Sequence, residues 1–182
     1  LAKKHGIKNI AVLEKGYLGG GSVGRNTQVT RSNYFWPESA AFFDHSLKLY
    51  ESMSADLNFN VMLSQRGILT LAHSHHDLEA LRRWANAIQV NAIDSELLTP
   101  GDVKRIAPLI RMDGRYPVHG GFIQRRGGIS RHDAVAWAYA RAASALGADI
   151  IQQCEVTGLT IEEAEDEVRR ISRLQQKEDV LR

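Results

Sequence analysis

The stretch NIAVLEKGYLGGGSVGRN, residues 9–26, constrains the fold of this chain more than any other feature. Its apolar run, residues 10–13, is short, continuous and bounded by polar residues and glycines, which is typical of a strand buried on both faces of a parallel sheet. Glu14 follows this run directly. In a dinucleotide-binding βαβ unit, an acid at this position accepts hydrogen bonds from ribose hydroxyls, roughly 20 residues after a G-x-G-x-x-G turn. The stretch therefore predicts part of an α/β nucleotide-binding unit, with an ordinary strand and a surface glutamate as the alternative.

The residues before this strand leave no room for the rest of such a unit. The opening LAKKHGIK is typical of the last turns of a helix, because three basic side chains suit the negative end of its dipole and Gly6 suits the left-handed residue that ends it. Counting roughly 20 residues back from Glu14 passes the first residue. We therefore expect the chain to be a fragment that begins inside the first βαβ unit, without the first strand and the glycine turn.

Composition excludes several classes of protein. The 182 residues can bury one sizeable core, and 43% hydrophobic with 24% charged residues is ordinary for a soluble globular domain. The net charge of +2 comes from 23 basic and 21 acidic residues spread along the chain, which leaves no footprint for nucleic acid. Cys154 has no second cysteine to pair with, and the sequence shows no signal peptide and no apolar run long enough to span a bilayer. These features predict a reducing, cytoplasmic setting with no membrane and no nucleic-acid partner.

Elements of alternating type follow the glycine cluster. The spacing of apolar residues and the positions of proline and glycine predict helices over 37–58, 75–90, 100–107 and 130–146, strands over 67–73 and 150–156, and extended chain with turns over 115–128. Thr99 can cap the third helix with Pro100 in its first position, and Gly147 can end the fourth. The buried face of the fourth helix is expected to carry Val135, Ala138, Ala142 and Leu146.

The segment GGGSVGRNTQVTRSNY, residues 19–34, is a candidate ligand loop. Glycines let the backbone come close to a ligand, and the arginine, asparagine and threonine side chains supply hydrogen-bond donors. A flexible surface loop is the alternative. Its position directly after a strand that ends on an acid favours the ligand loop. The residues on which this interpretation depends are Gly19, Gly20, Gly21, Arg25, Asn26, Thr27 and Arg31.

Two histidine segments are further candidates. GGISRHDAVAW places His132 in the first turn of a helix, where the dipole and the free N–H groups disfavour a protonated imidazole and keep a ring nitrogen available as a nucleophile or hydrogen-bond partner. Spacing alone favours a histidine without a role. HSHHD, residues 73–77, has the residue types of a metal site, but helical ligands lie at i and i+4, and adjacent His75 and His76 point apart. We interpret it as a polar connection from strand to helix and predict no metal.

Two long stretches resemble a known family. VLEKGYLGGGSVGRNTQVTRSNYFWPESAAFFDHSLKLYESMSADLNFNVMLSQRGILTLAH and GRYPVHGGFIQRRGGISRHDAVAWAYARAASALGADIIQQCEVTG are similar to the beta subunits of heterotetrameric sarcosine oxidases, and the likeness extends to about Gly158. The resemblance implies an α/β fold: a partial Rossmann-like FAD domain, whose first strand and G-x-G-x-x-G turn are missing, and part of a mixed α+β substrate domain. The FAD-domain segments are expected at about 1–45 and 128–158, and the substrate-domain segment at about 46–127.

The resemblance also implies an activity. It is the oxidative demethylation of sarcosine to glycine, in which FAD takes the hydride and FMN relays electrons to oxygen. The products are formaldehyde, or methylene-tetrahydrofolate, and hydrogen peroxide, and the partners are the alpha, gamma and delta subunits. The fragment alone is expected to be inactive. The alternatives are a non-catalytic remnant that self-associates and a fragment of another FAD-dependent amine oxidase, of the glycine or dimethylglycine type.

Site residues are implied by the same resemblance. Glu14 and Lys15 would bind the adenosine ribose of FAD, and the backbone of Val156, at the end of its strand, would meet the adenine. His132 matches the histidine that holds FMN covalently through its 8α carbon. Arg31 aligns with an arginine beside the flavin in monomeric amine oxidases and is the candidate catalytic residue. The residues expected to contact the FAD diphosphate and the flavin side are Gly20, Gly21, Ser22, Arg25, Asn26 and Thr27.

The residues after Gly158 depart from the family. We expect residues 159–182 to form an amphipathic helix, because a narrow apolar stripe is flanked by charges. On the remnant hypothesis this stripe would support self-association. It comprises Ile161, Ala164, Val168, Ile171 and Leu174.

Overall fold

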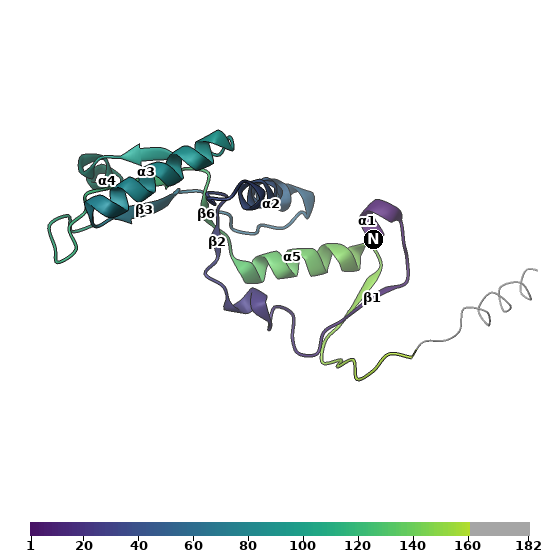
Figure 1. Ribbon diagram of the computed structural model, residues 1–182. Helices are drawn as coiled ribbons and strands as arrows, with labels where there is room; N and C mark the ends of the chain where they lie inside the picture. The colour runs from purple at the N-terminus through teal and green to yellow at the C-terminus, as the bar shows by residue number, and fades with distance from the viewer. Residues whose placement is uncertain (161–182) are drawn as a thin grey trace, which may run out of the picture.

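The computed structural model describes residues 1–160, so the predicted stripe from Ile161 to Leu174 lies outside the described residues. The elements are α1 (Ala2–His5), β1 (Ile10–Leu13), the 3-10 helix η1 (Ser22–Arg25), β2 (Val29–Thr30), α2 (Pro37–Asp56), β3 (Ile68–Ala72), α3 (His75–Val90), β4 (Glu96–Leu98), α4 (Pro100–Ile106), β5 (Gly120–Gln124), β6 (Gly128–Ile129), α5 (His132–Ala145) and β7 (Ala148–Ile151). One lobe holds β3, β4 and β5 with α3 and α4, and the other holds β1, β7 and α5 (Figure 1). Among the helices of the described residues, none combines the length and the apolar character needed to cross a bilayer.

The lobe that contains the chain start is built on two parallel strands. β1 pairs with β7 from Ile10 opposite Ala148 to Leu13 opposite Ile151. The prediction that β1 is buried on both faces is wrong, since Val12 and Leu13 are each 47% exposed. The reason is that β7 is the only strand beside β1 within residues 1–160, and α5 contacts mainly β7 rather than β1.

The strand predicted to reach Val156 is β7, which ends at Ile151. Gln153 adopts a φ of 58°, and the N–H of Cys154 donates to the carbonyl oxygen of Glu14 at 2.9 Å. These features turn the chain along the loop that follows β1 and end the strand ladder. Val156 therefore lies beyond the strand, and the prediction that it ends the strand is wrong.

The helix predicted over residues 130–146 begins at His132 as α5. Its predicted buried face is confirmed at Ala138, which is fully buried in a cluster with Met53 and Val61. The same prediction is wrong for Leu146, which is 48% exposed because it follows the last turn as the C-terminal cap residue.

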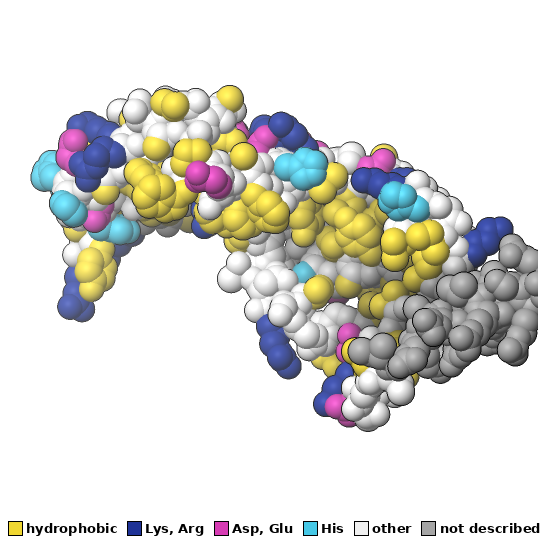
Figure 2. Space-filling view, turned by 45° about the vertical axis from the view of Figure 1, so that its right-hand side comes forward, with side chains coloured by type: hydrophobic (Ala, Val, Ile, Leu, Met, Phe, Trp, Pro, Cys, Tyr) yellow, Lys and Arg dark blue, Asp and Glu magenta, His cyan; other side chains and the backbone are white. Residues whose placement is uncertain are grey.

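Large apolar side chains stay exposed on two helices. Phe42 and Leu49 of α2 and Trp137 and Tyr139 of α5 are each about half exposed or more. Figure 2 shows hydrophobic side chains gathered on one face of the molecule. Extended exposed apolar surface is uncommon on soluble monomers and is the physical basis of the predicted self-association, which stays a prediction.

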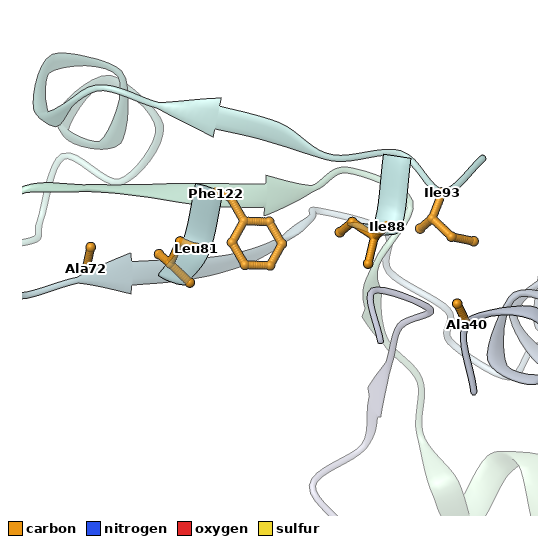
Figure 3. Close-up of a cluster of buried hydrophobic side chains, with 6 residues drawn as sticks. All are labelled: Ala40, Ala72, Leu81, Ile88, Ile93 and Phe122. Carbon is orange, nitrogen blue, oxygen red and sulfur yellow. The ribbon is translucent and has the colours of Figure 1, made fainter. Parts of the chain in front are cut away.

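In the other lobe, helices cover both faces of an antiparallel sheet with the order β3-β5-β4. The central strand β5 is buried throughout. Its neighbouring residues Phe122 and Ile123 point to opposite faces. Phe122 packs with Leu81 and Ile88 of α3 (Figure 3), while Ile123 packs in a cluster with Val103 of α4.

The sequence signals at two helix starts are confirmed. The hydroxyl of Ser74 accepts a backbone N–H of the first turn of α3 at 3.0 Å, so HSHHD is the strand-to-helix connection that its spacing predicts. Thr99 and Asp102 form a capping box at the start of α4, with Pro100 in its first turn. Together these caps satisfy N–H groups that a helix cannot pair internally.

Short antiparallel pairings form the crossover between the lobes. β2 pairs with β6, with Thr30 opposite Gly128, and Ser64 forms a bridge with Ile129 on the other side of β6. A Cβ atom at Gly128 would lie 2.2 Å from the carbonyl oxygen of Ser64. Only glycine therefore lets these three backbone segments meet.

An ion-pair cluster ties α2 to the turn after β5. Arg126 donates to both carboxylate oxygens of Glu51, at 3.0 and 2.9 Å, and to Asp44 at 3.1 Å. The hydrogen bonds from Arg126 outweigh partial burial and lower the pKa of Glu51. Burial opposes ionisation of Asp44, but contacts with Lys48 and Arg126 leave its pKa lowered as well. Both carboxylates therefore stabilise the fold in their ionised form.

We expect Glu51→Gln to flatten the acid dependence of stability. Because the folded-state pKa of Glu51 lies below its ordinary value of 4.5, its stabilisation is present above pH 4.5 and is lost as the pH falls through the folded-state pKa. Thermal unfolding followed by circular dichroism should give a Tm that falls more steeply below pH 4.5 for the wild type than for the variant. Glu79→Gln, which removes an exposed pair with Arg82, is the control. Equal slopes for the wild type and Glu51→Gln would contradict this account.

Candidate cofactor site

Glu14 lies where the two parallel strands end. Its N–H donates to the carbonyl oxygen of Ile151 at 2.9 Å, which extends the β1–β7 ladder by one bond. Its Oε1 accepts the N–H of Gly16 at 2.7 Å, while Oε2 has no partner within residues 1–160. Lys15 pairs with Glu155, which holds the loop after β1 against the chain that leads to Val156. This edge therefore presents one unengaged carboxylate oxygen at the carboxyl ends of parallel strands, where open α/β sheets bind ligands.

The glycine cluster forms a closed turn. The N–H of Gly20 donates to the carbonyl oxygen of Tyr17 at 2.9 Å, and η1, which follows, packs against α5. A Cβ atom at Gly24 would lie 2.6 Å from the carbonyl oxygen of Gly19, so this position requires glycine. Gly21 has open space around its Cβ position. The N–H of Gly20 is thus engaged within the turn, and the exposed backbone of Gly21 and η1 is the part that can reach a ligand.

Asn26 shapes the chain between η1 and β2. Its Nδ2 donates to the carbonyl oxygen of Val23 at 2.6 Å, and its Oδ1 accepts the N–H of Gln28 at 2.7 Å. Gln28 has a φ of 62°, a left-handed conformation that the Asn26 side chain stabilises. Arg25 and Thr27 are exposed on either side and make no side-chain hydrogen bond within residues 1–160. Arg25 is therefore available as a cation, whereas the Asn26 side chain is engaged locally.

His132 opens α5 with an unsatisfied ring nitrogen. Its Nδ1 is buried and has no hydrogen-bond partner in the described part of the chain, and the same holds for the hydroxyl oxygen of Thr30. Both residues line a hollow of about 230 Å³. Buried polar groups are normally paired, so two unpaired groups at one hollow make it a candidate ligand site. The other residues that line this hollow are Val23, Asn26, Thr27, Gln28, Val29, Tyr50, Ser130 and Val135.

The two charged residues on either side of His132, Arg131 and Asp133, form an ion pair with each other. Arg131 donates to both oxygens of Asp133, at 3.0 and 2.7 Å. These hydrogen bonds lower the pKa of Asp133 and raise the pKa of Arg131. Asp133 is therefore engaged by Arg131 and also suits the first turn of a helix, where a negative charge is favoured.

Arg31 lines a second hollow beside the first. Its Nη1 donates to Oδ1 of Asn33 at 2.7 Å, and its guanidinium carbon lies 4.3 Å from the centre of the Tyr34 ring. This hollow has a volume of about 260 Å³ and shares Val29, Thr30 and Tyr50 with the hollow at His132.

The predicted site residues outside the glycine turn thus lie at three places. Glu14, Lys15 and Val156 gather at the β1–β7 edge, whereas Asn26, Thr27 and His132 surround one hollow and Arg31 the next. Sequence reasoning missed Thr30 and Tyr50, which line both hollows. No local pattern could have identified them, because a threonine in a strand and a tyrosine on a helix face are ordinary core residues.

Comparison with known proteins gives a consistent set of relatives. The family model described as FAD dependent oxidoreductase matches residues 1–180. The sarcosine oxidase subunit beta of Rhizobium meliloti (strain 1021) is 52% identical over 160 residues, which are 87% of this chain and 38% of that protein. The protein of the same name from Arthrobacter sp is also 52% identical over 160 residues, 87% of this chain and 40% of that one. The chain thus spans about two fifths of the length of these curated relatives.

Solved structures share the fold at lower identity. The L-proline dehydrogenase from P. horikoshii has a TM-score of 0.79 at 23% identity and covers 89% of this chain and 42% of its own. The glycine oxidase from Bacillus cereus ATCC 14579 has a TM-score of 0.79 at 21% identity and covers 90% and 44%. At these identities the likeness concerns the fold alone.

We expect Gly24→Ala to destabilise the glycine turn. The added methyl group would overlap the carbonyl oxygen of Gly19, and overpacking of this kind costs about 1–3 kcal/mol. The Tm measured by circular dichroism should fall by several degrees. Gly21→Ala is the matched control, since its methyl group meets nothing within 4 Å. A Tm for Gly24→Ala as high as that for Gly21→Ala would show that the turn is looser than described.

Proposed function

This chain belongs to the family of FAD dependent oxidoreductases, and from this membership we propose that it is part of a sarcosine oxidase that oxidises the CH–NH bond of its substrate. The observation that carries the proposal is the 52% identity over 160 residues with two sarcosine oxidase beta subunits. The resemblance that the sequence indicates is confirmed by these relatives. The mixed α/β fold is confirmed as well, since the structural neighbours are oxidoreductases of this fold.

The residues at the β1–β7 edge fit FAD. The unengaged oxygen of Glu14 suits ribose hydroxyls, which need an acceptor at the carboxyl end of the strand. The exposed backbone of Gly21 and Ser22 and the cation of Arg25 suit the diphosphate, whose charge needs donors. When bound, FAD supplies the acceptor for the hydride of the substrate. We assign Lys15, Thr27 and Val156 as further contacts, and Gly20 and Asn26, whose polar groups are engaged within the turn, as the residues that shape the loop.

The hollow at His132 is the proposed attachment point of a second flavin. We propose that His132 holds FMN covalently, and the support from the structure is its buried Nδ1, which has no partner within residues 1–160. The hydroxyl of Thr30 at the same hollow is equally unpaired and can bond to that group. A nucleophile of this kind needs a ring nitrogen that is not engaged elsewhere.

The two lobes support the proposed division into domains. Segments 1–45 and 128–158 would form the FAD domain, since they supply both strands of the parallel pair. Segment 46–127 contains the whole antiparallel sheet and would belong to the substrate domain. We further propose glycine, formaldehyde or methylene-tetrahydrofolate, and hydrogen peroxide as products, with alpha, gamma and delta subunits as partners in the cytoplasm.

The proposed substrate, sarcosine, can be tested in a complete enzyme that carries this chain as part of a chimeric subunit. Residues 1–158 would replace the matching region of the Rhizobium meliloti beta subunit, which would be expressed with its partner subunits. We expect oxidation of sarcosine, measured as hydrogen peroxide, with a higher kcat/KM than for glycine or dimethylglycine. The unmodified relative is the control for assembly. A preference for glycine or dimethylglycine in the chimera, but not in the control, would overturn the proposed substrate.

The role of His132 is tested on the same complex. His132→Ala should remove covalent FMN and leave noncovalent FAD, because the assigned FAD contacts lie elsewhere. Mass spectrometry of the tryptic peptide of residues 132–141 measures the modification directly. His76→Ala, an exposed histidine at the start of α3, is the matched control and should keep both flavins. An unmodified peptide from a complex that contains FMN and oxidises sarcosine would contradict the assignment.

A further inference from the structure

Gln124, at the end of β5, is completely buried and uses all its hydrogen-bonding capacity. Its Oε1 accepts the backbone N–H groups of Ser32 and Asn33, at 3.0 and 3.2 Å. Its Nε2 donates to the hydroxyl of Ser32 at 2.7 Å and to Oδ1 of Asp94 at 3.2 Å. A primary amide has two donors and two acceptor sites, and here each one has a partner. This side chain therefore fixes the backbone after β2 against the sheet of the other lobe.

The segment that Gln124 holds ends in a contact with Arg31. Asn33 is fixed through its N–H by Gln124 and through its carbonyl oxygen by Nε1 of Trp84, at 3.0 Å. The side-chain Oδ1 of Asn33 accepts a hydrogen bond from Nη1 of Arg31 at 2.7 Å. The guanidinium also lies over the Tyr34 ring, at 4.3 Å from its centre. The position of Arg31 therefore depends on the backbone that Gln124 fixes.

Most N–H donors of Arg31 have no protein partner within residues 1–160. A guanidinium carries five N–H groups, and Asn33 takes one of them in the described part of the chain. Arg31 has no carboxylate partner within residues 1–160, and it lines the hollow next to His132. An arginine of this kind is useful at a site only if its direction is fixed in advance.

We propose that Gln124 is a positioning residue that sets the direction of Arg31 at the hollow between β2 and α2. Neither of the two side chains of similar length, glutamate and methionine, can replace it. A glutamate keeps the acceptor for Ser32 and Asn33 but places its second oxygen against Oδ1 of Asp94, and a methionine leaves the two N–H groups unpaired. The role of Arg31 at a cofactor site rests on the proposed function, but the placement of Arg31 by Gln124 does not.

Nuclear magnetic resonance of the 182-residue chain tests the placement without any activity. The Tyr34 ring should shift the δ protons of Arg31 upfield, and Arg31→Lys identifies their signals. In Gln124→Met these signals should move to the positions of an unstructured arginine, and in Gln124→Glu they should move part of the way. Ile123→Val, a buried change on the other face of β5, should leave them in place. Unshifted Arg31 signals in a folded Gln124→Met or Gln124→Glu chain would overturn the proposal.

A double-mutant cycle of Gln124 and Arg31 in the chimeric enzyme, measured by kcat/KM, gives the second readout. Gln124→Glu should lower kcat/KM for sarcosine on the order of tenfold with Arg31 present and less than twofold in an Arg31→Ala background, since coupled residues are not additive. Equal losses in both backgrounds would overturn the proposal. Failure of all chimeras to oxidise sarcosine would count against the proposed function alone, because the magnetic resonance result stands apart from it.

Discussion

The approach of three backbone segments at Gly128 fixes the placement of the other elements. β6 pairs on one side with Thr30 and on the other with Ser64, and a side chain at Gly128 would collide with the Ser64 carbonyl at 2.2 Å. Backbone hydrogen bonds need this close approach, and a residue without a Cβ atom is the only one that permits it. The lobes are thus joined by main-chain contacts, which determine the register of the residues on either side.

This register brings the candidate residues together. Arg31 follows the paired residue Thr30, and His132 follows β6 by three residues, so the two hollows share the wall formed by β2 and Tyr50. The chain approaches this wall from the glycine turn and leaves it along α5, which leads back to the parallel pair of strands. One crossover therefore links the predicted nucleotide edge at Glu14 with the hollow at His132.

Sequence reasoning was most successful where structure is set by nearby residues. The cap at Thr99 and the strand-to-helix connection at HSHHD depend on contacts within a few positions and were predicted correctly. The burial of β1 was not predicted correctly, because burial depends on which other elements cover a strand. The hydrogen bonds of Gln124 to Ser32 join residues 92 positions apart, so no periodicity could reveal them. Likewise, the resemblance identified His132, but only the fold shows that its Nδ1 is unpaired beside Thr30.

The central claim is that the β1–β7 edge and the glycine turn after it form the FAD site, apart from the hollow at His132. The most direct test is a titration of the ¹⁵N-labelled chain with excess FAD, followed residue by residue through its amide signals. The account predicts shifts confined to Glu14 and Lys15, to the turn over residues 19–27 and to Val156 and its neighbours, with the antiparallel sheet unaffected. Shifts centred on β3, β4 and β5, or no shifts in a folded chain at saturating FAD, would contradict it.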